Sequence, residues 1–272
     1  PVSDTISVRL TGRAGAIGDY MKNTLTGGDE FGSRYEAVRG QILWEPSDDF
    51  EALVKVEHSS NRVDGGALVF NYIGDASCFL CNKVRNSGAN VPEYPSFRRA
   101  SAGTNPEYDD TKTTMAQLTM NLDAGDWRFT SVTAWQELKG GVNMDYDGPL
   151  TFLESDITEQ SNSLFQEVRA QHPIGDDGAF IAGLTYIDTD LHIQQASTFN
   201  AASAGFPAPL NGLSLRQFNQ TGESWSPFVS VEVPVSERIM LSGSLRYSKE
   251  RRVGNAISSN IGVFPPTYLP YD

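Results

Sequence analysis

The sequence predicts an all-β fold, an antiparallel transmembrane β-barrel of which this chain supplies about nine strands. Three observations predict it: apolar and polar residues alternate along most segments, short and long connections alternate, and aromatic residues gather at the strand ends on the apolar side. Only 39% of the residues are hydrophobic, which suits a barrel strand because it needs apolar residues only at every second position. No stretch approaches the roughly 18 unbroken apolar residues of a membrane helix.

The strands are marked, in chain order, by apolar residues two positions apart with polar residues between them. These apolar positions are Ile6, Val8 and Leu10; Val38, Ile42 and Trp44; Phe50, Ala52, Val54 and Val56; Ala116, Leu118, Met120 and Leu122; Trp127, Phe129 and Trp135; Val168 and Ala170; Phe180, Ala182, Leu184 and Tyr186; Trp225, Val229, Val231, Val233 and Val235; and Ile239, Leu241, Leu245 and Tyr247. No segment predicts a convincing helix. A soluble β-sandwich would also alternate, so the connections must decide.

The connections fall into two length classes. The short ones lie near residues 46–49, 123–126, 173–178 and 234–237. Outer-membrane barrels have short periplasmic turns and long extracellular loops, whereas loops beyond about 12–15 residues are uncommon in compact soluble domains. The sequence therefore predicts one partial barrel domain over residues 1–272, with extracellular loops at approximately 14–32, 60–110, 140–160, 193–221 and 252–272.

The aromatic residues on the apolar face form two belts. One belt lies beside the short turns, and the other lies about seven to ten residues away, which corresponds to roughly 18–25 Å along tilted strands. This is close to the height of a barrel's apolar band. We expect the following residues to lie at the lipid interface: Trp44, Trp127, Trp135, Trp225 and Tyr247. The alternative is that they are core aromatics of a sandwich.

The opposite face is predicted to line a hydrated, charged lumen. It carries Arg9, Arg39, Arg128, Arg169 and Arg246 together with Glu51, Glu57, Glu167 and Glu232. Such a wall suits a plug or a polar solute. The net charge of −13 argues against nucleic acid as a partner, because a phosphate-binding face needs clustered Lys and Arg. The histidines are isolated and no catalytic motif is present, so we expect no enzyme.

Two local motifs could carry chemistry in the loops. Cys78 and Cys81 lie in the longest loop, where a local disulfide is favoured over free thiols or a metal site, because the cell surface is oxidising. Asn143, Asp145 and Asp147, with Glu154 further on, nearly match the spacing of a calcium loop. The first ligand position is Asn and the flanking segments are strands, so an ordinary Asp-Gly turn is favoured over structural calcium. No other cofactor is expected.

Three motifs in the sequence resemble those of one family. The segment 164–169, with Gln166-Glu167-Val168-Arg169, resembles the "Q-E-(apolar)-R" strand of TonB-dependent outer-membrane receptors. Segments 225–238 and 241–248 resemble their "A-P-F … P-(apolar)-(T/S)-(D/E)-R … G-(apolar)-R-Y-(T/S)" hairpin, and segment 40–50 resembles their "R-G-x-L-x-W-x-P-(S/T)-D-D" hairpin. The likeness covers most of the chain, and the three motifs occur in the family's order.

The resemblance implies a barrel of about 22 strands whose lumen is filled by an N-terminal plug. It implies an outer-membrane receptor for energy-coupled uptake of a scarce, bulky solute: an iron chelate, cobalamin or a glycan. The implied partners are the plug, the remaining strands, outer-membrane lipids, the cargo and an inner-membrane energy-coupling complex. No plug is recognised in this chain, and an odd number of strands cannot close alone. The chain begins at Pro1, from which we expect processing or truncation.

Two other functions remain open. One is a passive porin-type diffusion channel, which needs no energy coupling. The other is a secreted β-sandwich binding module, which would be soluble without detergent.

Overall fold

A computed structural model describes residues 1–65, 79–86, 88, 99–100, 107–207, 211–236, 238–261 and 267–271 of the chain. Long antiparallel strands dominate it. The elements are β1 (Ile6–Ile17), β2 (Met21–Asn23), β3 (Asp29–Glu30), β4 (Gly32–Ser47), β5 (Phe50–Asp64), α1 (Phe79–Asn86), β6 (Arg99–Ala100), β7 (Tyr108–Ala124), β8 (Trp127–Asp145), η1 (Gly148–Leu150), β9 (Leu153–Ile174), β10 (Gly178–Phe199), η2 (Ala201–Ala204), β11 (Gly212–Ser236), β12 (Ile239–Arg246), β13 (Lys249–Ile261) and β14 (Thr267–Tyr271).

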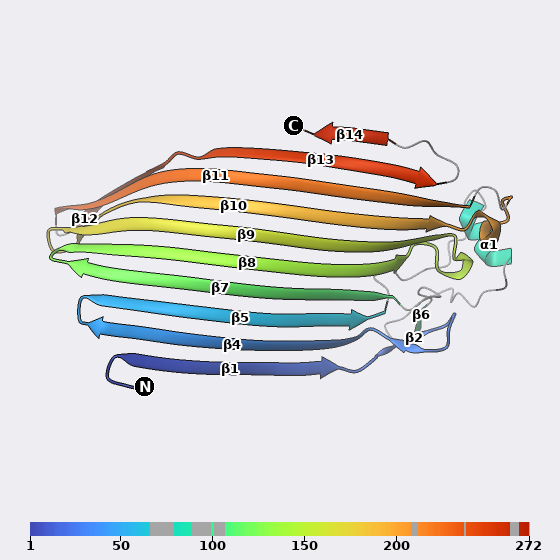
Figure 1. Ribbon diagram of the computed structural model, residues 1–272, viewed down its shortest axis with the longest axis horizontal. Coiled ribbons are helices and arrows are strands. Elements are labelled where there is room, and N and C mark those ends of the chain that lie inside the picture. Colours follow the sequence, from blue (N-terminus) through green and yellow to red (C-terminus); the bar gives the residue numbers. More distant parts are fainter. Residues whose placement is uncertain are drawn as a thin grey trace.

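One 11-stranded sheet holds most of the chain, in the order β1-β4-β5-β7-β8-β9-β10-β11-β13-β14, with β12 also paired to β11. Strands that follow one another along this order pair antiparallel, so the chain meanders from one edge of the sheet to the other (Figure 1). A second, small sheet has the order β3-β2-β6. The sheet is not closed on itself: β1 lies at one edge and β14 at the other.

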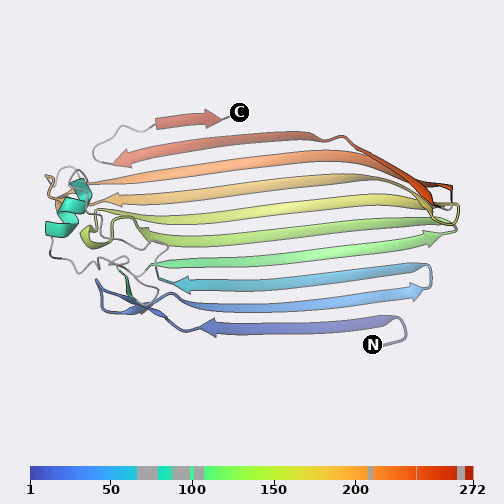
Figure 2. The ribbon, with the colours of Figure 1, turned by 180° about the vertical axis from the view of Figure 1, so that it is seen from behind.

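The two ends of the sheet differ. The β4–β5, β7–β8, β9–β10 and β11–β12 connections all lie at one end, called here the turn end, while α1 and the longer connections lie at the other, the loop end (Figures 1 and 2). Gly125 and Gly175 occupy the turns with φ of 62° and 63°, a conformation that glycine adopts without steric cost. The predicted alternation of short and long connections is therefore confirmed.

The apolar positions predicted for the lipid share one face of the sheet, called here the outward face. The register pairs Trp44 with Ala52, Ala52 with Met120, and Val168 with Leu184, and directly paired residues project from the same face. Large apolar side chains on this face are exposed, with Leu10 77%, Val168 51% and Leu245 72% accessible. A wide exposed apolar surface of this kind is typical of a surface that contacts lipid.

The charged residues predicted for the lumen lie on the opposite, inner face. The register aligns Glu51 with Asn121, Asn121 with Thr130, and Thr130 with Arg169. By the same register, the other charged residues predicted for the lumen project from this face: Arg9, Arg39, Arg128, Arg246, Glu57, Glu167 and Glu232. The division between the two faces is therefore confirmed.

The strands run further toward the loop end than the sequence predicted. The connection expected at 140–160 occupies residues 146–152, and the one expected at 193–221 occupies residues 200–211. Strand β13 crosses much of the loop expected after residue 252. The physical reason is that both faces are polar there, so the apolar alternation stops while backbone pairing continues.

The ninth predicted strand is divided into β12 and β13, with Tyr247 and Ser248 between them. Both parts keep the same register against β11, and the Tyr247 N–H donates to the Pro227 carbonyl at 3.1 Å. Pro227 lacks an N–H, so one ladder hydrogen bond is missing at this point. The short strand β14 and the eight-residue helix α1 were not expected from the sequence. Among the described residues, no helix has the length and apolar character needed to cross a bilayer.

Three polar residues lie within the apolar part of the outward face. Ser131, Thr133 and Gln166 lie on β8 and β9 among the apolar residues. Gln166 Nε2 donates to Ser131 Oγ at 3.1 Å, and Thr133 Oγ1 donates to Gln166 Oε1. These groups satisfy one another, which lowers the cost of placing them against hydrocarbon.

We expect Val168→Arg to destabilise the complete barrel by roughly 2–4 kcal/mol, because an arginine near the bilayer midplane loses its hydration. Val168 pairs with Ser131, which lies midway along β8 between Trp127 and Trp135. Ser244→Arg on the inner face is the matched control and should cost far less, because that face is polar and hydrated. Denaturant titration of the barrel folded into vesicles measures both. Equal losses from the two substitutions would contradict the assignment of the faces.

Candidate functional site

The inner face is a continuous polar wall. Arg39 Nε lies 2.6 Å from Glu57 Oε2, and Arg169 Nη1 lies 3.1 Å from Glu167 Oε1. Exposed ion pairs of this kind stabilise a protein by about 0–1 kcal/mol, so their main consequence is a charged, hydrated surface. Such a surface can border a polar solute or a folded domain.

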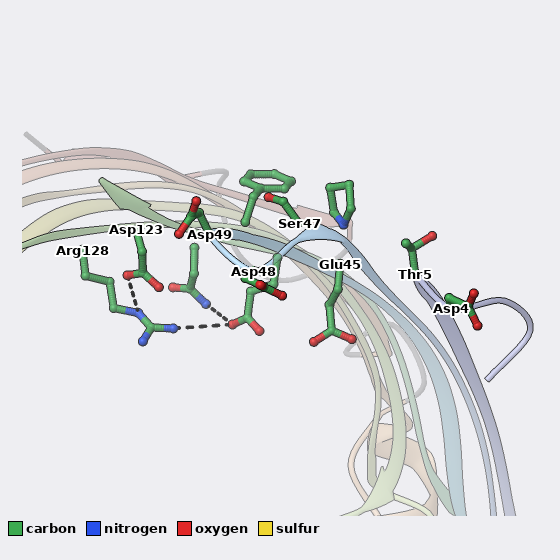
Figure 3. Close-up of a pocket in the computed structure, with 12 residues that line it drawn as sticks. Asp4, Thr5, Glu45, Ser47, Asp48, Asp49, Asp123 and Arg128 are labelled. Carbon is green, nitrogen blue, oxygen red and sulfur yellow. Dashed lines mark hydrogen bonds and ion pairs between the residues drawn. The ribbon is translucent and has the colours of Figure 1, made fainter. Parts of the chain in front are cut away.

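Toward the turn end this wall contains an acidic hollow of ≈ 510 Å³. Arg128 lies in it, 3.8 Å from both a Glu51 oxygen and an Asp123 oxygen, and Figure 3 shows Arg128 and Asp123 on the concave side of the curved sheet. The carboxylates that line the hollow are Asp4, Glu45, Asp48, Asp49, Glu51 and Asp123. Carboxylates outnumber the one cation in this lining, so the hollow favours cationic groups.

Hydrogen bonds fix the inner side of the hollow. Asn121 Nδ2 donates to Glu51 Oε1 at 2.5 Å, and Thr130 Oγ1 donates to Asn121 Oδ1 at 2.8 Å. Three neighbouring strands, β5, β7 and β8, contribute these side chains. The Oε1 atom of Glu51 therefore accepts from Asn121 and also forms the longer ion pair with Arg128.

The aromatic residues predicted for the lipid interface all lie on the outward face or at its border. Trp127 lies beside the turn end and contacts Phe180 edge-on, with ring centroids 6.4 Å apart. Trp225 packs against Tyr186 at 4.3 Å, nearer the loop end. Trp44 contacts Phe50, Trp135 faces outward, and Tyr247 follows Leu245. Their contact with lipid remains a prediction.

In the β8–β9 connection at the loop end, two of the candidate calcium carboxylates accept hydrogen bonds from backbone N–H groups. Asp145 Oδ1 accepts the N–H groups of Asp147 and Gly148 at 3.0 and 2.7 Å. Asp147 accepts the N–H groups of Phe152 and Leu153 at 2.9 and 3.0 Å. These bonds are local side-chain-to-backbone turns.

The other two calcium candidates, Asn143 and Glu154, lie on the strands beside this turn. Asn143 Nδ2 donates to Asp156 Oδ1 at 2.6 Å, and Glu154 lies on β9 opposite Asp145. Among the residues that the structure describes, no group of three or more His, Cys, Asp or Glu could hold a metal ion. The Asp-Gly turn is therefore present, and the calcium site remains a prediction.

Burial makes this turn sensitive to pH. Asp147 and Asp145 are 8% and 1% exposed, and Asp147 lies in the connection beyond β8. Burial, together with the nearby Asp145 carboxylate, raises the pKa of Asp147 to about 6, although the backbone N–H groups of Leu153 and Phe152 oppose the shift. Folding of the turn thus favours the protonated carboxyl group.

An aromatic cluster joins two loop-end connections. The Phe152 ring lies 6.4 Å from Phe199 and 6.3 Å from Phe206, and Phe206 is 39% exposed. Helix α1 contacts η1 beside this cluster. Cys78 lies outside the described residues and only the backbone of Cys81 is described, so the disulfide remains a prediction.

Sequence reasoning missed both the acidic hollow and this cluster. Asp48 and Asp49 read as turn residues, and Phe152, Phe199 and Phe206 lay in expected loops. The sequence contained one indication of the hollow. Glu51 and Asp123 lie next to two of the short turns, and their positions in the alternation place them on the inner face. The aromatic cluster forms because the β8–β9 and β10–β11 connections lie side by side. The spacing of residues along the sequence does not show this.

The architecture is an open antiparallel sheet with one apolar and one polar face, and comparison with solved structures identifies the fold. The ferric yersiniabactin uptake receptor FyuA from Yersinia pestis superposes with a TM-score of 0.77 at 18% identity, covering 98% of this chain and 38% of FyuA. The ferric-catecholate import receptor Fiu from E. coli K12 gives 0.54 at 11% identity, covering 96% and 48%. The ferripyoverdine receptor of the Pseudomonas aeruginosa outer membrane gives 0.61 at 9% identity, covering 100% and 36%.

The fold is therefore that of part of the barrel of TonB-dependent outer-membrane receptors. The chain spans between about a third and a half of the length of the receptors that it matches. These relatives are receptors and not enzymes. No protein-family model and no curated protein matches the sequence.

The raised pKa of Asp147 predicts a pH-dependent loop. The pKa of Asp147 is about 6 in the folded turn, against an ordinary value of 3.8. The contribution of Asp147 to the stability of the turn is therefore complete below about pH 4 and is lost as the pH rises toward 6. We expect the Phe152 and Leu153 amides to be less protected from hydrogen exchange at pH 7.5 than at pH 5. Asp147→Asn, which keeps an acceptor without a charge, should remove this dependence.

Asp147→Ala is the contrasting variant, because it leaves both amides without their acceptor. It should reduce protection at every pH, by about 1–3 kcal/mol of local stability. The prediction is wrong if Asp147→Asn keeps the pH dependence of the parent protein.

Proposed function

We propose that this chain is part of the barrel of an outer-membrane receptor that takes up a scarce, bulky solute by energy coupling, with ferric chelates as the first candidate class. The observation that carries the proposal is the two-sided sheet: an exposed apolar face opposite a charged inner wall, in a fold that matches uptake receptors over nearly its whole length. The three matched receptors are named for ferric yersiniabactin, ferric catecholate and ferripyoverdine. Cobalamin and glycans remain alternative cargo classes.

The proposal includes parts outside this chain. Further strands would pair with β1 and with β14, because an unpaired strand edge in hydrocarbon leaves backbone groups unsatisfied. A plug would occupy the space beside the inner wall, with cationic groups facing the acidic hollow. An inner-membrane complex would supply the energy from the periplasmic side.

A passive porin-type channel is the rival function, since it would share the same two-sided sheet. The receptor and the channel differ in that only the receptor needs energy coupling for uptake. A secreted β-sandwich is disfavoured, because the apolar face lies open over the whole sheet instead of packing against a second one.

The orientation of the barrel is tested by cysteine labelling on intact cells. After Cys78 and Cys81 are replaced by Ser, one variant carries Thr26→Cys at the loop end and another carries Asp126→Cys at the turn end. Both positions are exposed. A membrane-impermeant maleimide should label Thr26→Cys before lysis and Asp126→Cys only after it. The reverse pattern would contradict the proposed orientation.

Energy coupling is tested by transport. Cells that express the complete receptor should accumulate a radiolabelled ferric chelate, and a protonophore should abolish accumulation without abolishing surface binding. Cells without the gene are the control. Accumulation that continues in the presence of the protonophore would favour the passive channel, and absence of uptake for a panel of ferric chelates would exclude this cargo class.

A further inference from the structure

The β1–β4 connection has a small folded structure of its own at the loop end. Its strands β2 and β3 form a hairpin, and β2 also pairs in parallel with β6 of the β5–β7 connection (Figure 1). Met21 and Asn23 are 4% and 0% exposed, and Phe31 packs against Met21. The Phe31 N–H donates to the Asp64 carbonyl at the end of β5, at 2.8 Å. The two long connections therefore meet at one place, called here the loop junction.

A carboxyl group is part of the loop junction. Glu30 Oε1 accepts a hydrogen bond from Asn23 Nδ2 at 2.7 Å. The other oxygen, Oε2, is buried and has no hydrogen-bond partner in the part of the chain that the structure describes. An ionised carboxylate with a buried, unpaired oxygen loses its hydration without compensation. The folded junction therefore favours the neutral, protonated form of Glu30.

The nearest charge acts in the same direction. Burial is the main cause that raises the pKa of Glu30 above its ordinary 4.5, the Asp19 carboxylate raises it further, and the Asn23 hydrogen bond opposes both. Asp19 is held near the hairpin, because its Oδ1 accepts the Gly32 N–H at 2.9 Å. Glu30 therefore contributes fully to the stability of the junction below about pH 4.5, and this contribution is lost as the pH rises through the raised pKa.

Other charged residues lie on the elements around the loop junction: Lys22, Asp29, Asp64, Arg99 and Glu107. Lys22 and Asp29 are exposed and are paired with each other in the register of the hairpin. The Asp64 carboxylate forms ion pairs with two arginines, and the Glu107 carboxylate accepts a backbone N–H. Only the backbone of Arg99 is described.

The backbone beside Glu30 is held in a conformation that depends on its neighbours. Phe31 has a φ of 68°, in the left-handed region that a bulky residue rarely adopts. Such a conformation persists only where surrounding contacts hold it. The packing there is close, since a Cβ at Gly65 would lie 2.9 Å from Phe31 N and 3.1 Å from Glu30 Cβ. A change at Glu30 therefore acts directly on the contact between the two connections.

We propose that Glu30 is a pH-sensitive switch in the loop junction. Protonated Glu30 holds the β1–β4 connection against the end of β5, and ionisation of Glu30 loosens this contact. The buried, unpaired Oε2 atom carries the inference, because it makes the charged form costly only while the junction is closed. The switch goes beyond the proposed function, since it needs neither a cargo nor energy coupling.

The test is hydrogen exchange in the complete receptor at two amides of the junction. The Phe31 amide donates to the Asp64 carbonyl, and the Tyr20 amide donates to the Glu30 carbonyl at 3.1 Å. After correction for the intrinsic exchange rate, both amides should lose protection between pH 4 and pH 7.5. Glu30→Gln keeps an acceptor for Asn23 without a charge, so it should retain the protection seen at pH 4 at both pH values.

Two further variants separate the switch from a general effect. Asp29→Asn is the matched control, because it removes a charge from an exposed position of the same strand. It should leave the loss of protection unchanged. Glu30→Ala leaves Asn23 Nδ2 without its acceptor and should reduce protection at both pH values. Gel mobility of the unheated barrel confirms that each variant is folded.

Three outcomes overturn the inference. The first is equal protection of both amides at pH 4 and pH 7.5 in the parent protein. The second is a loss of protection that persists in Glu30→Gln, and the third is its disappearance in Asp29→Asn. Uptake is measured separately. Energy-coupled uptake together with amides that do not respond to pH overturns this inference alone, whereas the expected response in a protein without such uptake supports it and contradicts the proposed function.

Discussion

Hydrogen bonding between neighbouring strands is the constraint on which the rest of the structure depends. In hydrocarbon no water is present to satisfy a backbone N–H or C=O, so each strand must find its partners in the next strand. The antiparallel register from β4 to β11, which shifts between Trp44 and Ser47 beside the β4–β5 turn, meets this requirement. Side chains are then free to differ completely between the two faces. The exposed apolar face and the charged inner wall both follow from that freedom.

The same constraint explains how the chain tolerates its irregular positions. Pro227 removes one donor from the ladder, yet β12 and β13 keep the same register against β11 on both sides of it, as far as Pro234. Gln166 faces the apolar side, but Ser131 and Thr133 satisfy its side chain. In both cases the irregularity is confined to the residue and its neighbours, and the strands on either side remain paired.

Much of the fold was predictable from the sequence, because a bilayer imposes a period-two pattern on each crossing. Val54, Leu118 and Val168 could be assigned to a face from their neighbours alone, and the turn at Gly125 was marked by its Asp and Gly residues. The strand ends could not be predicted where water meets both faces, as at the exposed neighbours Thr158 and Glu159, because polar side chains then carry no periodic signal. The acidic hollow combines Asp4 with Asp123, and only the sheet order shows that such distant residues meet.

The length of β9 and β10 has a mechanical consequence. Each strand has 22 residues, which at about 3.3 Å per residue and a tilt near 40° rises roughly 55 Å, about twice the height of an apolar band of ~25 Å. With the membrane placement proposed above, about half of each strand would extend beyond the hydrocarbon as a stiff, hydrogen-bonded segment. The Phe152, Phe199 and Phe206 rings lie at the loop end of these strands, so in the proposed orientation a solute would meet them in water before it reached the level of the lipid.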